Sequence, residues 1–165
     1  MLTLVQLLQY QIDYTIWATA RLLNSATALS PDELNRDFGS ADKSVSGTLL
    51  HIYRSERSWL HRIVSPPDIP LELPSLEWAS VVEQWPALHQ QWREFAQTLT
   101  DECVNTVLEY RTMKGEPRRN GLWVIILHVV NHGTHHRGQV SGFLRALGKT
   151  PPSLDSISYA RELGI

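Results

Sequence analysis

The chain has 165 residues, 15 basic and 17 acidic side chains, and a formal net charge of −2. This balance argues against a protein held on nucleic acid by phosphate contacts, which usually carries a basic excess. The single cysteine, Cys103, excludes an intrachain disulfide and a four-thiolate zinc site. We expect one domain spanning residues 1–165, large enough to bury its core without covalent staples.

The apolar runs are short, and the opening segment carries no basic side chain. The run over 122–127 is far below the about 20 residues that a membrane span requires. The opening segment also lacks a cleavage site for secretion. We therefore expect a soluble cytoplasmic protein with no membrane or nucleic-acid partner.

Two long helices are predicted in the first part of the chain. Apolar residues at three- and four-residue spacings, with no Gly or Pro, predict a helix over 2–28 that Ser30-Pro31 ends. The polar stretch 34–43 is predicted to be a connection. Ser44 is predicted to be the N-cap of a second helix that reaches Val64.

A proline-rich crossover, ending at Pro74, is predicted to lead into a third helix over 75–98. Pro86 lies inside that helix and should kink it or shift its start. Alternation of apolar and polar residues over 104–110, followed by a turn at 114–116, then predicts a short β-hairpin.

A fourth long helix is predicted over 121–147, with Asn120 as its cap and Gly148 at its end. A short terminal helix is expected over 153–163. The predicted fold class is all-α, a four-helix bundle with a short β-hairpin between the third and fourth helices and a short C-terminal helix.

The fourth helix carries a histidine stripe on a stretch, 122–130, that is otherwise apolar nearly all round. His128, His132 and His136 recur every four residues, so successive members differ by only about 40° around the helix. Imidazoles on a buried helix need partners, and two of them one turn apart can hold one metal ion. For any single histidine, however, a hydrogen-bonded core position is the simpler interpretation.

The other histidines of the chain differ in their surroundings. His51 lies in the middle of the second helix among apolar neighbours, and it is predicted to point inward as a third candidate ligand. Small polar residues at Thr48 and Ser55 leave room beside its ring. His61 and His89 are predicted to lie on the surface, near a helix end and among Gln residues respectively.

Segment 131–139, Asn-His-Gly-Thr-His-His-Arg-Gly-Gln, resembles the NHxxxHRGQ signature of the DinB/YfiT-like family of metal-dependent proteins. His51, followed five and eight residues later by Glu56 and Trp59, is similar to the family's second-helix motif. Segment 14–23 is similar to its first-helix pattern, although Thr19 stands where Asn is common. The tail over 147–159 also fits, so the resemblance covers nearly the whole chain.

The resemblance implies an up-down-down-up bundle, commonly a homodimer, with a divalent ion, zinc or nickel, held by His51, His132 and His136. His128 and His135 are not family ligands. His128 is expected either to support the ligands or to line the pocket, and His135 lies about 100° away from its neighbours on the helix. Asn131, Arg137 and Gln139 are expected to supply supporting hydrogen bonds. Glu56 lies about 140° from His51 and is predicted to be structural.

Three neutral imidazoles would leave a divalent ion with its full charge and an open position, which is typical of catalytic rather than structural sites. The resemblance implies a metal-dependent enzyme, a thiol S-transferase or a hydrolase, acting on a small molecule that is a thiol in several branches. Gly133 follows His132, so the HExxH pattern of zinc peptidases is absent.

Two non-enzymatic alternatives stay open, and no catalytic residue is assigned. One is a metal-binding or stress-response protein without turnover. The other is a dimeric interaction module in which the histidines are merely hydrogen-bonded. The family's association with DNA-damage induction concerns the regulation of genes and does not indicate DNA binding.

Overall fold

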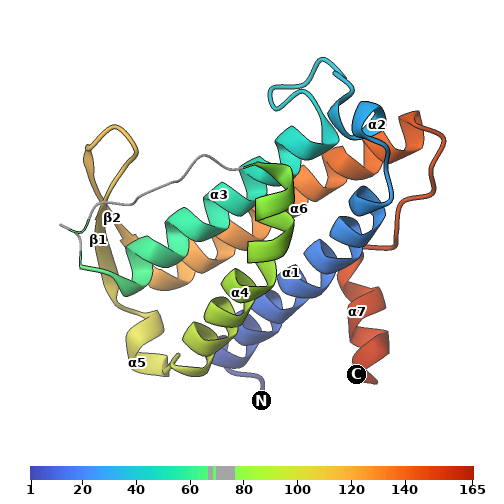
Figure 1. Cartoon of the computed structure of the whole chain (residues 1–165). Coiled ribbons are helices and arrows are strands. Elements are labelled where there is room, and N and C mark those ends of the chain that lie inside the picture. Colours follow the sequence, from blue (N-terminus) through green and yellow to red (C-terminus); the bar gives the residue numbers. More distant parts are fainter. Residues whose placement is uncertain (67–68, 70–76) are drawn as a thin grey trace.

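The computed structural model describes residues 1–66, 69 and 77–165. Four long helices run side by side, with a two-stranded hairpin at one end of the bundle (Figure 1). The long helices are α1 (Leu4–Thr27), α3 (Val45–Val64), α4 (Trp78–Gln97) and α6 (Leu122–Ala146). The short elements are α2 (Pro31–Asn35), α5 (Asp101–Val104), β1 (Val107–Arg111), β2 (Pro117–Gly121) and α7 (Ser156–Leu163). The predicted bundle, hairpin and terminal helix are therefore confirmed.

The directions of the helices follow from side-chain contacts. Tyr53 and Glu56 of α3 meet Gln84 and His89 of α4, so these two helices run in parallel. The ring of His51 packs on that of His136, and Trp59 packs on His128, which makes α3 and α6 antiparallel.

Helix α1 runs opposite to α4, because Gln9 bonds the carbonyl of Ala96 while Asp13 pairs with Arg93. Taken in chain order, the four long helices therefore run up, down, down and up. Helix α1 packs against α4 and α6, and α3 packs against the same two helices. This arrangement agrees with the topology that the family resemblance implies.

Local sequence explains where most helices begin. The Ser44 hydroxyl accepts a hydrogen bond from the Gly47 amide, as its prediction as the N-cap of α3 requires. Ser30 caps the short helix α2, which begins at Pro31. The last two residues of α2 lie in the stretch 34–43 that was predicted to be a connection, so this prediction is wrong at its start. Helix α4 continues through Pro86, and the predicted crossover and the start at residue 75 lie largely outside the described residues.

One predicted cap is wrong. Asn120 lies in strand β2, opposite Leu108, and its side-chain oxygen accepts a hydrogen bond from the Tyr110 hydroxyl. Helix α6 instead starts after Gly121, without a side-chain cap. The side-chain oxygen of Asn120 is bonded across the hairpin to Tyr110 and makes no capping hydrogen bond to α6.

The core lies between the four long helices and combines aliphatic side chains with the aromatic rings of Tyr53, Trp85 and Trp92. Its fully buried members include Leu8, Leu22, Leu49, Ile52, Val81, Trp85 and Ile126. Among the described residues, no helix combines the length and apolar character needed to cross a membrane.

Candidate metal centre

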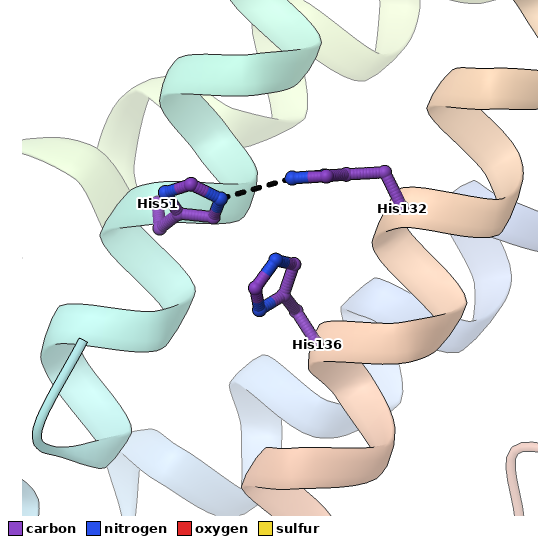
Figure 2. A group of neighbouring side chains, drawn as sticks. All are labelled: His51, His132 and His136. Atoms are coloured by element: carbon purple, nitrogen blue, oxygen red, sulfur yellow. Dashed lines mark hydrogen bonds between the residues drawn. The ribbon is translucent and has the colours of Figure 1, made fainter. Parts of the chain in front are cut away.

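The three histidines predicted as ligands meet between α3 and α6. Figure 2 shows their rings turned toward one another, His51 from α3 and His132 and His136 from successive turns of α6. One ligating nitrogen from each ring lies within 4.8 Å of the others. The Nε2 atoms of His51 and His132 are 2.9 Å apart, so one ring donates a hydrogen bond and the other accepts it.

The outer nitrogen of His136 is held by a residue of the same helix. Its Nδ1 lies 2.8 Å from the side-chain oxygen of Gln139, to which it donates. The Gln139 amide nitrogen is in turn 3.3 Å from Nε2 of His135. Gln139 therefore fixes the His136 ring so that Nε2 is free to face the other two histidines, which is the supporting role expected from the sequence.

The carboxylate of Asp42, which was not predicted to take part in the site, lies beside the same rings. Its Oδ1 is 3.6 Å from Nδ1 of His51, and its Oδ2 is 3.8 Å from Nδ1 of His136. Asp42 belongs to the polar connection before α3, and nothing in its spacing indicates a site. Only the path of the folded loop brings it to the histidines.

Burial keeps the His132 and His136 rings neutral, because it lowers the pKa of each. It lowers the pKa of His132 to about 4, and the neighbouring His136, His51 and His128 rings add to this effect. Burial also lowers the pKa of His136, although the hydrogen bond to Gln139 opposes the change. At neutral pH these two rings therefore offer lone pairs without first having to release a proton.

The donor set fits a divalent transition metal. Imidazole nitrogens suit zinc, nickel and copper, and two nitrogens bound to one tetrahedral zinc ion lie about 3.3 Å apart. The 2.9 Å between Nε2 of His51 and His132 is close to that value, so a small movement of the rings would accommodate the ion. The His51 side chain is 41% exposed, which leaves the cluster open to solvent.

The remaining histidines of α6 lie beside the cluster rather than in it. The ring centre of His128 is 5.8 Å from that of His132 and 5.3 Å from that of Trp59. His135 packs against His136 with ring centres 4.8 Å apart. Neither belongs to the group of converging ligand atoms, which agrees with the family resemblance.

Glu56 and His89 form a second, buried polar pair between α3 and α4. Oε2 of Glu56 accepts a hydrogen bond of 2.8 Å from Trp85 Nε1 and lies 3.3 Å from Nε2 of His89. Glu56 thus contacts Trp85 and His89 and does not belong to the three-histidine group, as its position on the helix predicted. The surface prediction for His89 is wrong, because this side chain is buried. Trp85 and Trp92, four residues before and three after His89, place it on the inward face and were the signal that could have shown this.

Gly133 of the motif leaves room for the buried side chain of Arg137. Arg137 is buried, and its guanidinium donates to the hydroxyls of Thr19 and Thr134. A Cβ at position 133 would lie 2.7 Å from Nη1 of Arg137, so glycine provides the room for the guanidinium. Arg137 therefore ties α6 to α1 through Thr19, the position where the first-helix pattern departs from the family.

The comparisons with known proteins agree with this architecture. The model of the DinB family matches residues 1–163. Protein DinB of Bacillus subtilis (strain 168) is 23% identical over 145 residues, which cover 82% of this chain and 83% of that protein.

Two solved structures share the fold. A DinB-like protein from Bacillus cereus matches with a TM-score of 0.62 and 17% identity, covering 83% of this chain and 90% of its own. YfiT from Bacillus subtilis, described as a probable metal-dependent hydrolase with an unusual four-helix bundle topology, matches with a TM-score of 0.63 and 17% identity, covering 85% and 87%. At these identities the likeness extends to the fold alone.

Proposed function

The chain belongs to the DinB family, and we propose that it is a metal-dependent enzyme that holds one divalent cation, zinc or nickel, on His51, His132 and His136. The reaction class we favour is hydrolysis of a small-molecule substrate. This choice draws on YfiT, which shares the fold and is described as a probable metal-dependent hydrolase.

The observation that supports the proposal most is the convergence of three imidazoles from two helices in a site open to solvent. Structural zinc sites are normally closed by four protein ligands, whereas catalytic ones use three and keep a position for water or substrate. The described residues within reach supply three such nitrogens and one carboxylate, Asp42, on the outer side of the rings.

A divalent cation at such a site supplies Lewis acidity, which polarises a substrate oxygen and makes a nucleophile available near neutral pH. The residues of the chain provide the rest of the arrangement. His132 and His136 stay neutral because burial lowers the pKa of each ring. Gln139 holds His136 with Nε2 facing the other two histidines.

The binding test compares protein purified without a histidine tag with two variants of it. We expect stoichiometric metal in the wild type, and a loss of zinc affinity in His132→Ala. His61→Ala is the matched control, because His61 bonds Ser65 and the carbonyl of Ile69 and takes no part in the cluster. Wild-type protein without metal, together with unchanged zinc affinity in His132→Ala, would show that the three-histidine site is wrong.

A second experiment asks whether an outside ligand reaches the ion. The visible spectrum of cobalt-substituted protein should shift when azide or a small thiol is added, since three protein ligands leave a position open. A spectrum that stays unchanged after either addition would favour a closed site and contradict the enzymatic proposal. His51→Ala should lose the metal and keep the bundle, because the apolar core lies apart from the cluster.

A further inference from the structure

Asp42 contacts two of the three histidines, although it precedes α3 and lies outside the family motifs. We propose that Asp42 is a positioning residue of the metal site, whose carboxylate holds the outer nitrogens of His51 and His136 and so directs both Nε2 atoms at one cation. This inference rests on the proposed function and extends it to a residue outside the ligand set.

The two carboxylate oxygens of Asp42 face different helices. Oδ1 approaches His51 of α3 at 3.6 Å and Oδ2 approaches His136 of α6 at 3.8 Å, in each case at Nδ1. These separations exceed a direct hydrogen bond, but at this range the negative carboxylate still attracts an N–H dipole of each ring. One carboxylate thus bridges the two helices that supply the ligands.

The loop that carries Asp42 is held in place at several points. Lys43 adopts a left-handed backbone with φ of 64°, which is uncommon for a residue other than glycine. The Asp42 carbonyl accepts a hydrogen bond of 2.7 Å from the Ser44 amide and packs directly on Gly47, where no side chain intervenes. Earlier in the loop, the ring of Phe38 stacks on Phe143 of α6 at 4.4 Å.

This constrained backbone is the physical reason that Asp42 can act as a positioning residue. A carboxylate on a freely moving loop would lose conformational entropy each time it contacted the rings. Here the Lys43 turn, the contact with Gly47 and the Phe38 stack have already fixed the loop against both ligand-bearing helices. The entropic cost of the contact is therefore limited to fixing the rotamer of the Asp42 side chain.

The chemistry of metal-bound histidine explains what the carboxylate contributes. A ligating imidazole binds through one nitrogen, and a carboxylate on the other N–H fixes the tautomer, orients the ring and makes it a stronger ligand. Among the described acidic residues, Asp42 alone lies within 4.0 Å of a nitrogen of these three rings. Its negative charge also offsets part of the charge that three neutral ligands leave on the cation.

The two histidines depend on Asp42 to different degrees. His136 already donates to Gln139 through Nδ1 at 2.8 Å, so its tautomer has a second support. His51 has no comparable partner among the described residues, and Asp42 is the acceptor beside its Nδ1. Loss of the carboxylate should therefore disturb His51 more than His136, and both more than His132, which Asp42 does not contact.

The test measures zinc affinity by competition with a coloured chelator for Asp42→Ala and Asp42→Asn. We expect affinity 10- to 100-fold weaker than wild type, the usual effect of removing such a supporting group. Asp37→Asn is the matched control, because it removes the same charge from the same loop while its side-chain oxygen can still accept from the Gly39 amide. Thermal melts by circular dichroism verify that each variant folds, and Asp42→Asn preserves the shape of the side chain.

Histidine NMR on the zinc-loaded proteins provides a readout that does not depend on affinity. Nitrogen-15 shifts in the wild type should report Nδ1–H and a ligating Nε2 for His51 and His136. In the Asp42 variants the His51 signals should move most.

Variants that bind zinc within twofold of wild type, while His132→Ala loses it, would overturn the inference and leave the proposed function intact. Wild-type protein that binds no zinc would overturn both.

Discussion

Replacing Gly47 with alanine tests whether the Asp42 loop is packed as tightly against α3 as the structure shows. Gly47 lies in the first turn of α3, and its amide donates to the Ser44 hydroxyl. A Cβ at this position would collide with the Asp42 carbonyl oxygen, and it would lie 3.2 Å from that carbonyl carbon and 3.3 Å from Ser44 Oγ. The nearest obstacle is backbone, so it cannot turn aside as a flexible side chain would.

Two opposing effects set the magnitude. Alanine is better than glycine in a helix by about 1 kcal/mol, and by less in the first turn. Forcing a methyl group into a filled space typically costs about 1–3 kcal/mol. The clash should win, so we expect Gly47→Ala to be destabilised by about 1–2 kcal/mol, which lowers the melting temperature by about 2–8 °C for a domain of this size.

Gly142→Ala is the matched control. Gly142 is exposed on α6, and a Cβ there would meet no atom within 4 Å, so the same exchange should stabilise the protein by about 0.5–1 kcal/mol. Urea unfolding of the metal-free proteins measures both values. Because Gly47→Ala must displace Asp42, its zinc affinity should also fall. A Gly47→Ala protein as stable as Gly142→Ala would refute the close packing of the loop.

Two other predictions concern the buried polar groups. Glu56→Ala should destabilise the protein by about 1–3 kcal/mol for each buried donor left without an acceptor, chiefly Trp85 Nε1, whereas Glu56→Gln keeps an acceptor and should lose less in urea unfolding; a loss below about 0.5 kcal/mol in Glu56→Ala would contradict this. The pKa of His132 is about 4 when folded and 6.5 when unfolded, so the unfolded chain binds more protons between these values. The melting temperature of metal-free protein should therefore fall as the pH drops from 6.5 to 4, and it should fall less steeply in His132→Ala. If the melting temperatures of both proteins fall equally steeply with pH, the assignment of this pH dependence to His132 is wrong.

Sequence periodicity was sufficient to predict the four long helices and two of the three histidines of the site. His132 and His136 are one turn apart on the same helix, so the geometry of the α-helix alone places them on one face. The N-cap at Ser44 was equally local, since a serine before an apolar repeat caps the first turn with its own hydroxyl. The short helices α2 and α5 were missed, because four or five residues are too few to show a period.

The tertiary structure decided which side chains meet across elements. The inward direction of His51 could be predicted from its neighbours, but its partner helix came only from the family resemblance. His89 was assigned to the surface from adjacent Gln residues, yet its pairing with Glu56 depends on α3 and α4 running in parallel.

Asp42 shows the limit of sequence reasoning most clearly. A loop has no repeating geometry, so the position of its side chain depends on one left-handed residue, Lys43, and on the space left by Gly47. The sequence by itself thus determined the helices and the pair of histidines on α6, because those follow from a regular backbone. Only the folded chain decided that a third histidine and a carboxylate close around them, because contacts between distant segments follow from packing rather than from spacing.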